Sequence, residues 1–266
     1  MADMSAFWKA WAPYWRAIEN RNLDVPTIRR LEPAITSPVL MIGAGQGLLV
    51  ERLRKDGFRV DGIDAEPEMI AYAKKRRGLD LLEANARALP FPDDSYATVI
   101  VATGVIDFLD HDETIRSILD EAIRVARPSG EVFIAFYKMR ERVEALLERL
   151  GMFTEGGHYY RMREIARAEF ASPRLLVRIV RADRGILAAL SAWLKMQFLS
   201  RKQRTILAAV APEVVPYRRD DAIRRLFDAL GVPVHRIHGF ETCAVVQLAH
   251  RPRVADHRPA PELRSP

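Results

Sequence analysis

The chain has 266 residues, of which 49% are hydrophobic and 29% are charged, and its formal net charge is +6 at pH 7. These values exclude a wholly disordered chain and allow a full hydrophobic core. The single cysteine, Cys243, excludes an internal disulfide and a metal site built from cysteine spacing, so no metal is expected. No secretion signal and no apolar stretch of the ~18 residues that a membrane span needs are found, so a cytoplasmic location is expected.

The first forty residues are typical of two helices, and aromatic residues that include Trp11 and Tyr14 recur at helical spacing in the first one. From residue 39 onward, strands alternate with helices. Strands are expected at 39–42, 59–64, 79–83, 97–103 and 131–137, and helices at 48–57, 67–76 and 112–127, with Asp110 or Asp112 as the cap of the last one. This alternation predicts βαβ units and a parallel sheet.

Beyond residue 138 the alternation stops. Most of the next ninety residues are predicted to be helical, and strand patterns at 232–238 and 242–249 then predict a closing hairpin. The residues after 251 are rich in proline and arginine, which predicts a disordered tail.

A glycine-rich loop separates the first strand of this pattern from the next helix. Gly43, Gly45 and Gly47 leave the backbone open to a ligand, and the helix N-terminus offers N–H donors. Asp64 ends the second strand about twenty residues later, where a carboxylate can accept hydrogen bonds from ribose hydroxyls. In the dinucleotide pattern G-x-G-x-x-G the third glycine would fall at position 48, where this chain has Leu48. The third glycine here is Gly47, one place earlier, and this disfavours a ligand with a pyrophosphate. Without Asp64, the loop would fit an ordinary strand-to-helix turn equally well.

Three segments extend this pattern in order: VLMIGAGQG, VDGIDAEPEMIAYAKKR and EANARALPFPDDSYATVIVATGVIDFLDHDETIRSILDEAIRVARPSGEVFIAFY. Together they resemble the methyltransferase type-11 family of class I S-adenosylmethionine-dependent methyltransferases, over residues 39–137. The most specific piece, ARALPFPDDSYATVIV, resembles the segment of the family that contacts the adenine and leads into the fourth strand.

The resemblance implies S-adenosylmethionine as the cofactor. The glycine loop would lie at its methionine end, Asp64 at the ribose and Asn85 at the adenine amino group. Thr103 and Val105 would face the sulfonium and the acceptor. Trp11 and Tyr14 would belong to a lid over the cofactor, or would pack the first helix on the core. The implied contacts are Gly43, Ala44, Gly45, Gly47, Asp64, Ala65, Met69, Asn85, Ala86, Thr103, Val105, Trp11 and Tyr14.

Some positions depart from the family pattern. Met41, Asn85 and Ala97 stand where the family often has aspartate, and the family's Pro-Gly-Gly is Pro-Ser-Gly at 128–130. Asn85 can still donate or accept a hydrogen bond, whereas Met41 and Ala97 cannot. The glycine loop and Asp64 are kept, so these changes bear more on activity than on cofactor binding.

The resemblance also implies the fold: α/β, with a Rossmann-like, doubly wound and mostly parallel seven-stranded sheet, an N-terminal helical lid and a helical insertion between strands five and six. The chain then divides into the lid, the cofactor-binding core, the acceptor-binding insertion, a closing hairpin and a tail, at 1–37, 38–138, 139–230, 231–250 and 251–266. An apolar helix near 186–199 would bind a hydrophobic acceptor or form ordinary core. A basic amphipathic stretch at 174–184 can lie on anionic lipid or in solvent.

Methyl transfer needs a base where the acceptor carries a proton. Asp107 follows the fourth strand, where the family commonly has His, and is the first candidate for this base or for a group that orients the acceptor. A cap or an ion-pair partner is the alternative. Further candidates are His111, one helical turn further, and the cluster at His158 and Tyr159. The alternative for His111 is an exposed residue, and the alternative for the cluster is an ordinary loop.

The predicted function is transfer of a methyl group from S-adenosylmethionine to a small or lipid-like acceptor by in-line displacement. The alternatives are an RNA or protein methyltransferase, a nicotinamide-dependent oxidoreductase and a non-catalytic scaffold with this fold. The chain has no D/N/S-P-P-Y/F/W segment and no recognised RNA-binding module, which argues against nucleic acid as a partner. It has no Tyr-x-x-x-Lys pair, which argues against the oxidoreductase. The acceptor atom and the oligomeric state stay open.

Overall fold

The structure is a computed structural model that describes residues 30–138, 140–153, 159–161, 178, 181, 187, 215–216, 218–240 and 243–249. Trp11, Tyr14 and His158 lie outside the described residues, as do most of the predicted lid, most of the insertion and the predicted tail.

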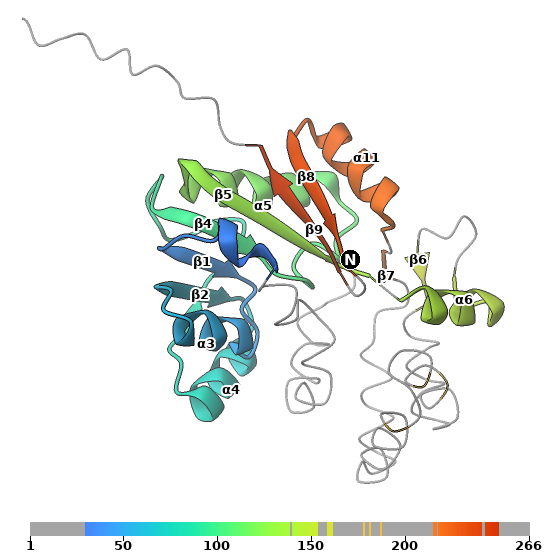
Figure 1. Ribbon diagram of the computed structural model, residues 1–266, viewed down its shortest axis with the longest axis horizontal. Coiled ribbons are helices and arrows are strands. Elements are labelled where there is room, and N and C mark those ends of the chain that lie inside the picture. The colour runs from blue at the N-terminus through green and yellow to red at the C-terminus, as the bar shows by residue number, and fades with distance from the viewer. Residues whose placement is uncertain are drawn as a thin grey trace, which may run out of the picture.

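Among the described residues, seven strands form one sheet in the order β3-β2-β1-β4-β5-β9-β8 (Figure 1). Neighbouring strands from β3 to β5 are parallel, whereas β9 is antiparallel to both β5 and β8. The predicted seven-stranded α/β sheet is therefore confirmed, and it is a mixed sheet. In that order, the strands are Leu82–Glu83, Val60–Asp64, Val39–Ile42, Tyr96–Val101, Ala126–Tyr137, Cys243–Leu248 and Val234–Gly239.

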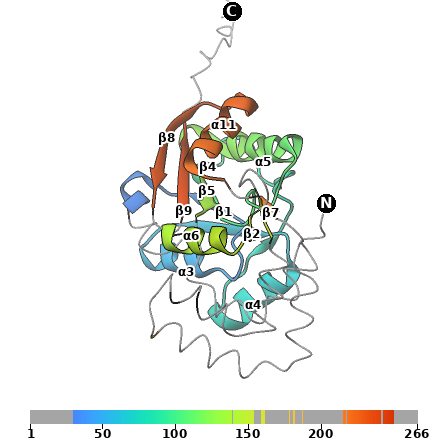
Figure 2. The ribbon, with the colours of Figure 1, turned by 90° about the vertical axis from the view of Figure 1, so that its right-hand side faces the viewer.

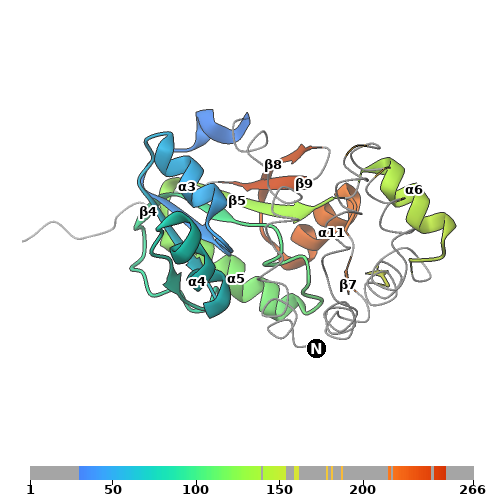
Figure 3. The same ribbon diagram turned by 90° about the horizontal axis from the view of Figure 1, so that it is seen from below.

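Helices cover both faces of the sheet, because the side chains of β1, β4, β5 and β9 alternate between two hydrophobic clusters. In β1, Leu40 and Ile42 belong to the cluster that includes residues of α5 (Asp112–Val125). Val39 and Met41 belong to the cluster that includes residues of α3 (Leu48–Lys55). Figures 2 and 3 show α3 and α5 on opposite sides of the sheet, as a doubly wound fold requires.

The strand order reverses between β1 and β4. β2 pairs with one edge of β1 and β4 with the other, so the chain leaves the two central strands in opposite directions. In open α/β sheets, the crevice at the carboxyl ends of such strands is where ligands bind. The turn after β1 and the loop after β4 therefore meet at one place, close to the start of α4 (Pro67–Arg77).

The strand β5 begins at Ala126, five residues before the predicted start. Its pairing with β4 shifts register, because Tyr96 lies opposite Ala126 whereas Thr98 lies opposite Glu131. The residues skipped by this irregularity include Pro128, which has no N–H to donate to a neighbouring strand. The predicted start at 131 thus marks the resumption of regular pairing.

The helix α11 (Asp220–Leu230), which lies within the predicted insertion at 139–230, packs on the core. Ile223 and Phe227 are fully buried in the cluster that also contains α5, and the rings of Phe136 and Phe227 meet edge to face with centroids 6.0 Å apart. We therefore place the end of the insertion before Asp220. Within the insertion, α6 (Glu141–Arg149) and an antiparallel pair of short strands, β6 (Tyr159–Tyr160) and β7 (Val215–Pro216), are described.

No described helix combines the length and the apolar character needed to cross a membrane.

Candidate cofactor-binding site

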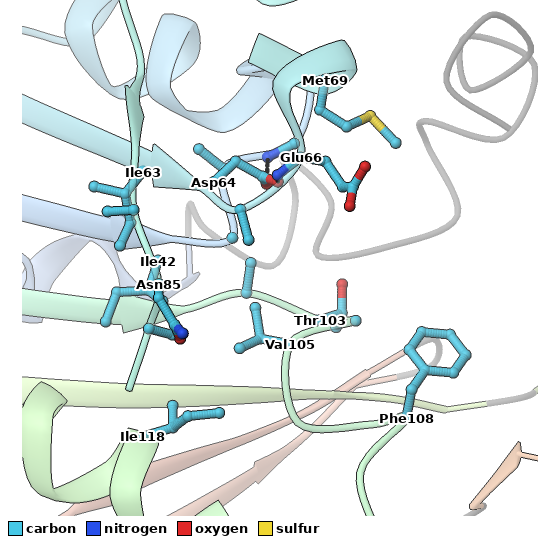
Figure 4. A pocket seen from close by; sticks show the side chains of 18 of the residues that line it. Ile42, Ile63, Asp64, Glu66, Met69, Asn85, Thr103, Val105, Phe108 and Ile118 are labelled. Atoms are coloured by element: carbon cyan, nitrogen blue, oxygen red, sulfur yellow. Dashed lines mark hydrogen bonds between the residues drawn. The ribbon is translucent and has the colours of Figure 1, made fainter. Parts of the chain in front are cut away.

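A pocket of about 420 Å³ opens at the carboxyl ends of β1, β2 and β4 (Figure 4). Its walls come from the glycine loop, the start of α4, the loop after β3, the loop after β4 and one face of α5. Small-molecule sites have volumes of roughly 300–1,000 Å³, so the pocket is large enough for a nucleoside-sized ligand. It lies at the point where the strand order reverses, which is where open α/β sheets bind ligands.

The three loop glycines all have left-handed backbone angles, with φ of 73° at Gly43, 54° at Gly45 and 78° at Gly47. A Cβ at Gly43 would lie 2.2 Å from Cγ2 of Val105, so the loop packs directly against the loop after β4. A Cβ at Gly45 would have nothing within 4 Å, so the backbone beside the pocket is unobstructed there. Gly47 does not line the pocket; a Cβ there would lie 2.5 Å from Cδ1 of Leu79. Close packing thus explains glycine at position 47, and a ligand is not needed to explain it.

Asp64 joins the end of β2 to the glycine loop. Its Oδ2 accepts a hydrogen bond of 2.7 Å from the N–H of Gly45, and its Oδ1 accepts one of 2.9 Å from the N–H of Glu66. Burial raises the pKa of this carboxyl above its ordinary value, against the backbone N–H donors of Glu66, Gly45 and Ala65, which lower it. A carboxylate can accept about four hydrogen bonds. Asp64 therefore keeps the capacity to accept from two neighbouring hydroxyls at the pocket.

The pocket brings most of the predicted cofactor residues together, although they come from four separate parts of the chain. In Figure 4, Asp64 and Met69 lie on one side of the opening, and Val105 and Phe108 lie on the other. The Oδ1 of Asn85 also accepts a 2.9 Å hydrogen bond from the N–H of Arg87, which fixes its side chain. The predicted residues that line the pocket are Gly43, Ala44, Gly45, Asp64, Ala65, Met69, Asn85, Ala86, Thr103 and Val105.

Several lining residues were not predicted. Glu66 precedes α4, Phe108 and Leu109 lie in the loop after β4, and Thr114 and Ile118 lie on α5. The spacing of Thr114 and Ile118 places them on one face of a helix, and this signal could have found them. Nothing in the sequence separates Phe108 and Leu109 from ordinary apolar loop residues.

Asp107 is buried but does not line the pocket. Its Oδ2 accepts a 2.5 Å hydrogen bond from the N–H of Gly104, and its Oδ1 accepts a 2.6 Å bond from the N–H of Tyr137. Burial raises the pKa of this carboxyl, against these donors and the nearby charge of Arg218. Both carboxylate oxygens of Asp107 thus bond to backbone N–H groups, and these bonds shape the loop after β4.

Of the other predicted catalytic residues, His111 does not line the pocket. His111 is the residue before α5, where it makes no side-chain capping bond; its side chain is 59% exposed and lies 3.4 Å from Asp110. The predicted cap, Asp110 or Asp112, thus does not occupy the N-cap position. The backbone of Tyr159 pairs with Pro216 in the short β6–β7 ladder.

The apolar replacements in the family pattern fit their surroundings. Met41 is 1% exposed and packs in the cluster that contains α3, so an aspartate there would need a partner within that core. Ala97 is the second residue of β4 and is partly buried, and its N–H donates to the carbonyl of Pro38. Neither replacement alters the glycine loop or Asp64.

Comparison with known proteins matches residues 39–130 to a family described as a methyltransferase domain. A demethylmenaquinone methyltransferase from Thermus thermophilus is 37% identical over 100 residues, which are 36% of this chain and 44% of the relative. A ubiquinone/menaquinone biosynthesis C-methyltransferase from Rickettsia massiliae is 32% identical over 123 residues, 41% of this chain and 48% of the relative. An uncharacterised protein from Mycobacterium tuberculosis is 40% identical over 99 residues, 35% of each chain. The chain thus matches less than half the length of each of these relatives.

Solved structures extend the likeness in fold over most of the chain. A SAM-dependent methyltransferase from Methanosarcina mazei superposes with a TM-score of 0.54 at 15% identity, over 84% of this chain and 96% of that one. The glycopeptide N-methyltransferase MtfA superposes with a TM-score of 0.50 at 13% identity, over 85% and 88%. Residues 39–130 are therefore similar to a methyltransferase domain, and the chain shares its fold with a solved SAM-dependent methyltransferase.

Proposed function

We propose that the whole chain is an S-adenosylmethionine-dependent methyltransferase that acts on a small, lipid-like acceptor. The observation that carries the proposal is the junction of Gly45 and Asp64 at the pocket, where an unobstructed backbone turn is hydrogen-bonded to a half-buried carboxylate. This junction offers a polar cradle for an amino-acid group and acceptors for ribose hydroxyls side by side.

The residues present fit the cofactor. The backbone of Gly43 and Gly45 would hold its methionine end, and Asp64 would accept hydrogen bonds from the ribose. The side chain of Met69 would pack on the adenine, with Asn85 at its polar edge. When bound, the cofactor supplies a methyl group on a positively charged sulfur, which passes to a nucleophile while the electrons of the C–S bond remain on the sulfur.

The loop after β4 would place the acceptor. Thr103 and Val105 lie in the loop after β4, beside the glycine loop, and Phe108 adds an aromatic surface to the same wall (Figure 4). Apolar walls exclude water from the transfer and orient a hydrophobic acceptor in line with the bond that breaks. The predicted lid with Trp11 and Tyr14, and the acceptor-binding role of the insertion, belong to this proposal.

The lipid-like acceptor is supported by two lines of argument. Curated relatives are named as demethylmenaquinone methyltransferases and as quinone-biosynthesis C-methyltransferases. The side chains of Val105, Phe108 and Leu109 give the wall after β4 an apolar character. Both carboxylate oxygens of Asp107 accept backbone hydrogen bonds, so this side chain is not placed to act as a base. An acceptor that loses its proton readily would not need one.

The experiment supplies methyl-labelled S-adenosylmethionine together with a reduced demethylated quinone, a short structured RNA and a basic protein in parallel reactions. Wild type is expected to place label in the organic extract, and the Asp64→Ala variant to lose that signal. Label confined to the RNA or the protein fraction would replace the lipid-like acceptor with the alternative enzyme class. Binding of the cofactor without transfer to any member of an extended acceptor panel would favour the scaffold.

A further inference from the structure

The loop after β4, residues 102–109, forms one wall of the pocket. Thr103, Gly104, Val105, Phe108 and Leu109 all line it. This segment is not part of a helix or a strand. The N–H of Ala102 donates to the carbonyl of Ile42 at the end of β1, and two further backbone bonds form turns within the segment. Two side chains add bonds that tie it to other parts of the chain.

One of these side chains is that of Asp107, which ties the loop to the sheet. Its carboxylate links the N–H of Gly104 to the N–H of Tyr137, the last residue of β5. Gly104 has a φ of 90°, a conformation that disfavours other residues. The carboxylate thus holds a glycine turn at the pocket against the end of the neighbouring strand.

The second side chain is that of Arg218, which reaches the loop from a distant part of the sequence. Its Nη2 donates a 2.5 Å hydrogen bond to the carbonyl of Leu109, and its Nη1 donates a 3.3 Å bond to the carbonyl of Asp107. The guanidinium also attracts the carboxylate of Asp107. A planar guanidinium has the fixed fork of donors that two carbonyls on one turn require.

Arg218 lies at the point where the chain returns from the insertion to the core. The next residue, Arg219, forms ion pairs with Glu144 and Glu148 of α6. The residue after it, Asp220, pairs with Lys138, just beyond β5, at 3.1 Å. Residues 218–220, which we name the return junction, thus connect the pocket wall, the first helix of the insertion and the end of β5.

We propose that Arg218 and Asp107 are positioning residues that hold the loop after β4 in its ligand-binding position and join that position to the return junction. The effect of these two residues on cofactor binding rests on the proposed function, because the loop that Arg218 and Asp107 hold is a wall of the proposed cofactor pocket. Val105 is in this wall and packs so closely on Gly43 that a Cβ there would overlap its methyl group. A displacement of the loop therefore changes the glycine loop as well.

The test compares Arg218→Ala and Arg218→Lys with Arg219→Ala in the full chain. Arg219 is the matched control, because it lies in the same junction and carries the same charge but bonds to Glu144 and Glu148, not to the loop. Two quantities are measured: hydrogen exchange of residues 102–109 in the ligand-free protein, by mass spectrometry, and the dissociation constant for S-adenosylhomocysteine, by calorimetry.

We expect Arg218→Ala to speed exchange of residues 102–109 and to weaken S-adenosylhomocysteine binding, each by about tenfold, the size of losing a hydrogen bond from a charged donor. Exchange in β1 should stay at the wild-type rate, which a general loss of stability would not allow. Arg218→Lys should recover part of both effects, because an ammonium bonds to one carbonyl at a time. Arg219→Ala should leave loop exchange unchanged.

Wild-type loop exchange in Arg218→Ala, or equal acceleration in Arg219→Ala, would overturn the inference. A wild-type protein that does not bind S-adenosylhomocysteine would contradict the proposed function instead, while exchange of the loop would still decide the positioning role. Should Arg218→Ala fail to fold, the comparison of Arg218→Lys with Arg219→Ala decides by the same measurements.

Discussion

The N–H of Gly45 donates a 2.7 Å hydrogen bond to Oδ2 of Asp64, and this bond joins the turn after β1 to the end of β2. The two residues are nineteen positions apart in the sequence. The bond fixes the glycine turn and aligns a carboxylate beside it, so one contact shapes both the backbone cradle and the acceptor of the pocket.

Gly45→Ala should weaken binding of S-adenosylmethionine by about tenfold, because a methyl group would enter the space beside the pocket. Gly78→Ala is the matched control: Gly78 ends α4 with a similar φ, and a Cβ there also meets nothing within 4 Å. Both variants should lose about 1–2 kcal/mol of stability from backbone strain. Calorimetry and thermal unfolding separate the two effects, and equal affinities in both variants would remove Gly45 from the site.

The affinity for S-adenosylmethionine should depend on the ionisation of Asp64. Ribose hydroxyls donate to the carboxylate, so binding favours its ionised form, and burial raises the pKa of the free site above 3.8. Affinity should therefore fall as the pH drops through that raised pKa, by at most about tenfold per pH unit for one proton. Titrations of wild type and Asp64→Asn across this range test it; a parallel fall in Asp64→Asn would assign the dependence to another group.

Asp107 should make folding stability depend on pH in the opposite sense to a salt-bridged aspartate. Burial raises its folded pKa above 3.8, so the folded state holds a proton that the unfolded state has lost. Stability therefore falls as pH rises from 3.8 to the folded pKa. The difference in unfolding free energy between wild type and Asp107→Asn, from urea denaturation, should shift in favour of the variant over this interval. A difference independent of pH would show that the folded pKa is not raised.

Phe227→Ala should destabilise the fold by about 3–5 kcal/mol, because it removes a ring buried against Phe136. Arg225→Ala, on the exposed side of the same helix, should change stability by less than about 0.5 kcal/mol. The pair tests whether α11 belongs to the core. Similar small losses in both variants, measured by urea unfolding, would return α11 to the insertion.

Local sequence patterns predicted most of the elements that position the site. The apolar run at 39–42 and the glycines after it located β1 and its turn, and Asp64 located the end of β2, because these signals depend on neighbours in the sequence. The early start of β5 at Ala126 was missed, because pairing beyond a proline depends on the partner strand. The docking of α11 was missed because amphipathic spacing gives a helix a buried face without saying what covers it.

The pocket itself was predicted less evenly. Residues that belong to a recognised pattern, such as Gly43, Asp64 and Met69, line it. Gly47 belongs to the same pattern but packs on Leu79, and the carboxylate of Asp107 bonds to the backbone. Neither contact could be predicted, because the spacing of residues in a sequence does not determine packing distances or side-chain directions. Arg218 could not be placed, since its bond to Leu109 spans 109 positions and only the folded chain brings them together.

Calorimetric titration of wild type and Asp64→Ala with S-adenosylmethionine, S-adenosylhomocysteine and NAD measures directly which cofactor the pocket binds. We expect micromolar binding of both sulfur ligands by wild type, weaker binding by the folded variant, and no binding of NAD. A well-folded wild type that binds neither sulfur ligand, or that binds NAD in their place, would contradict this expectation.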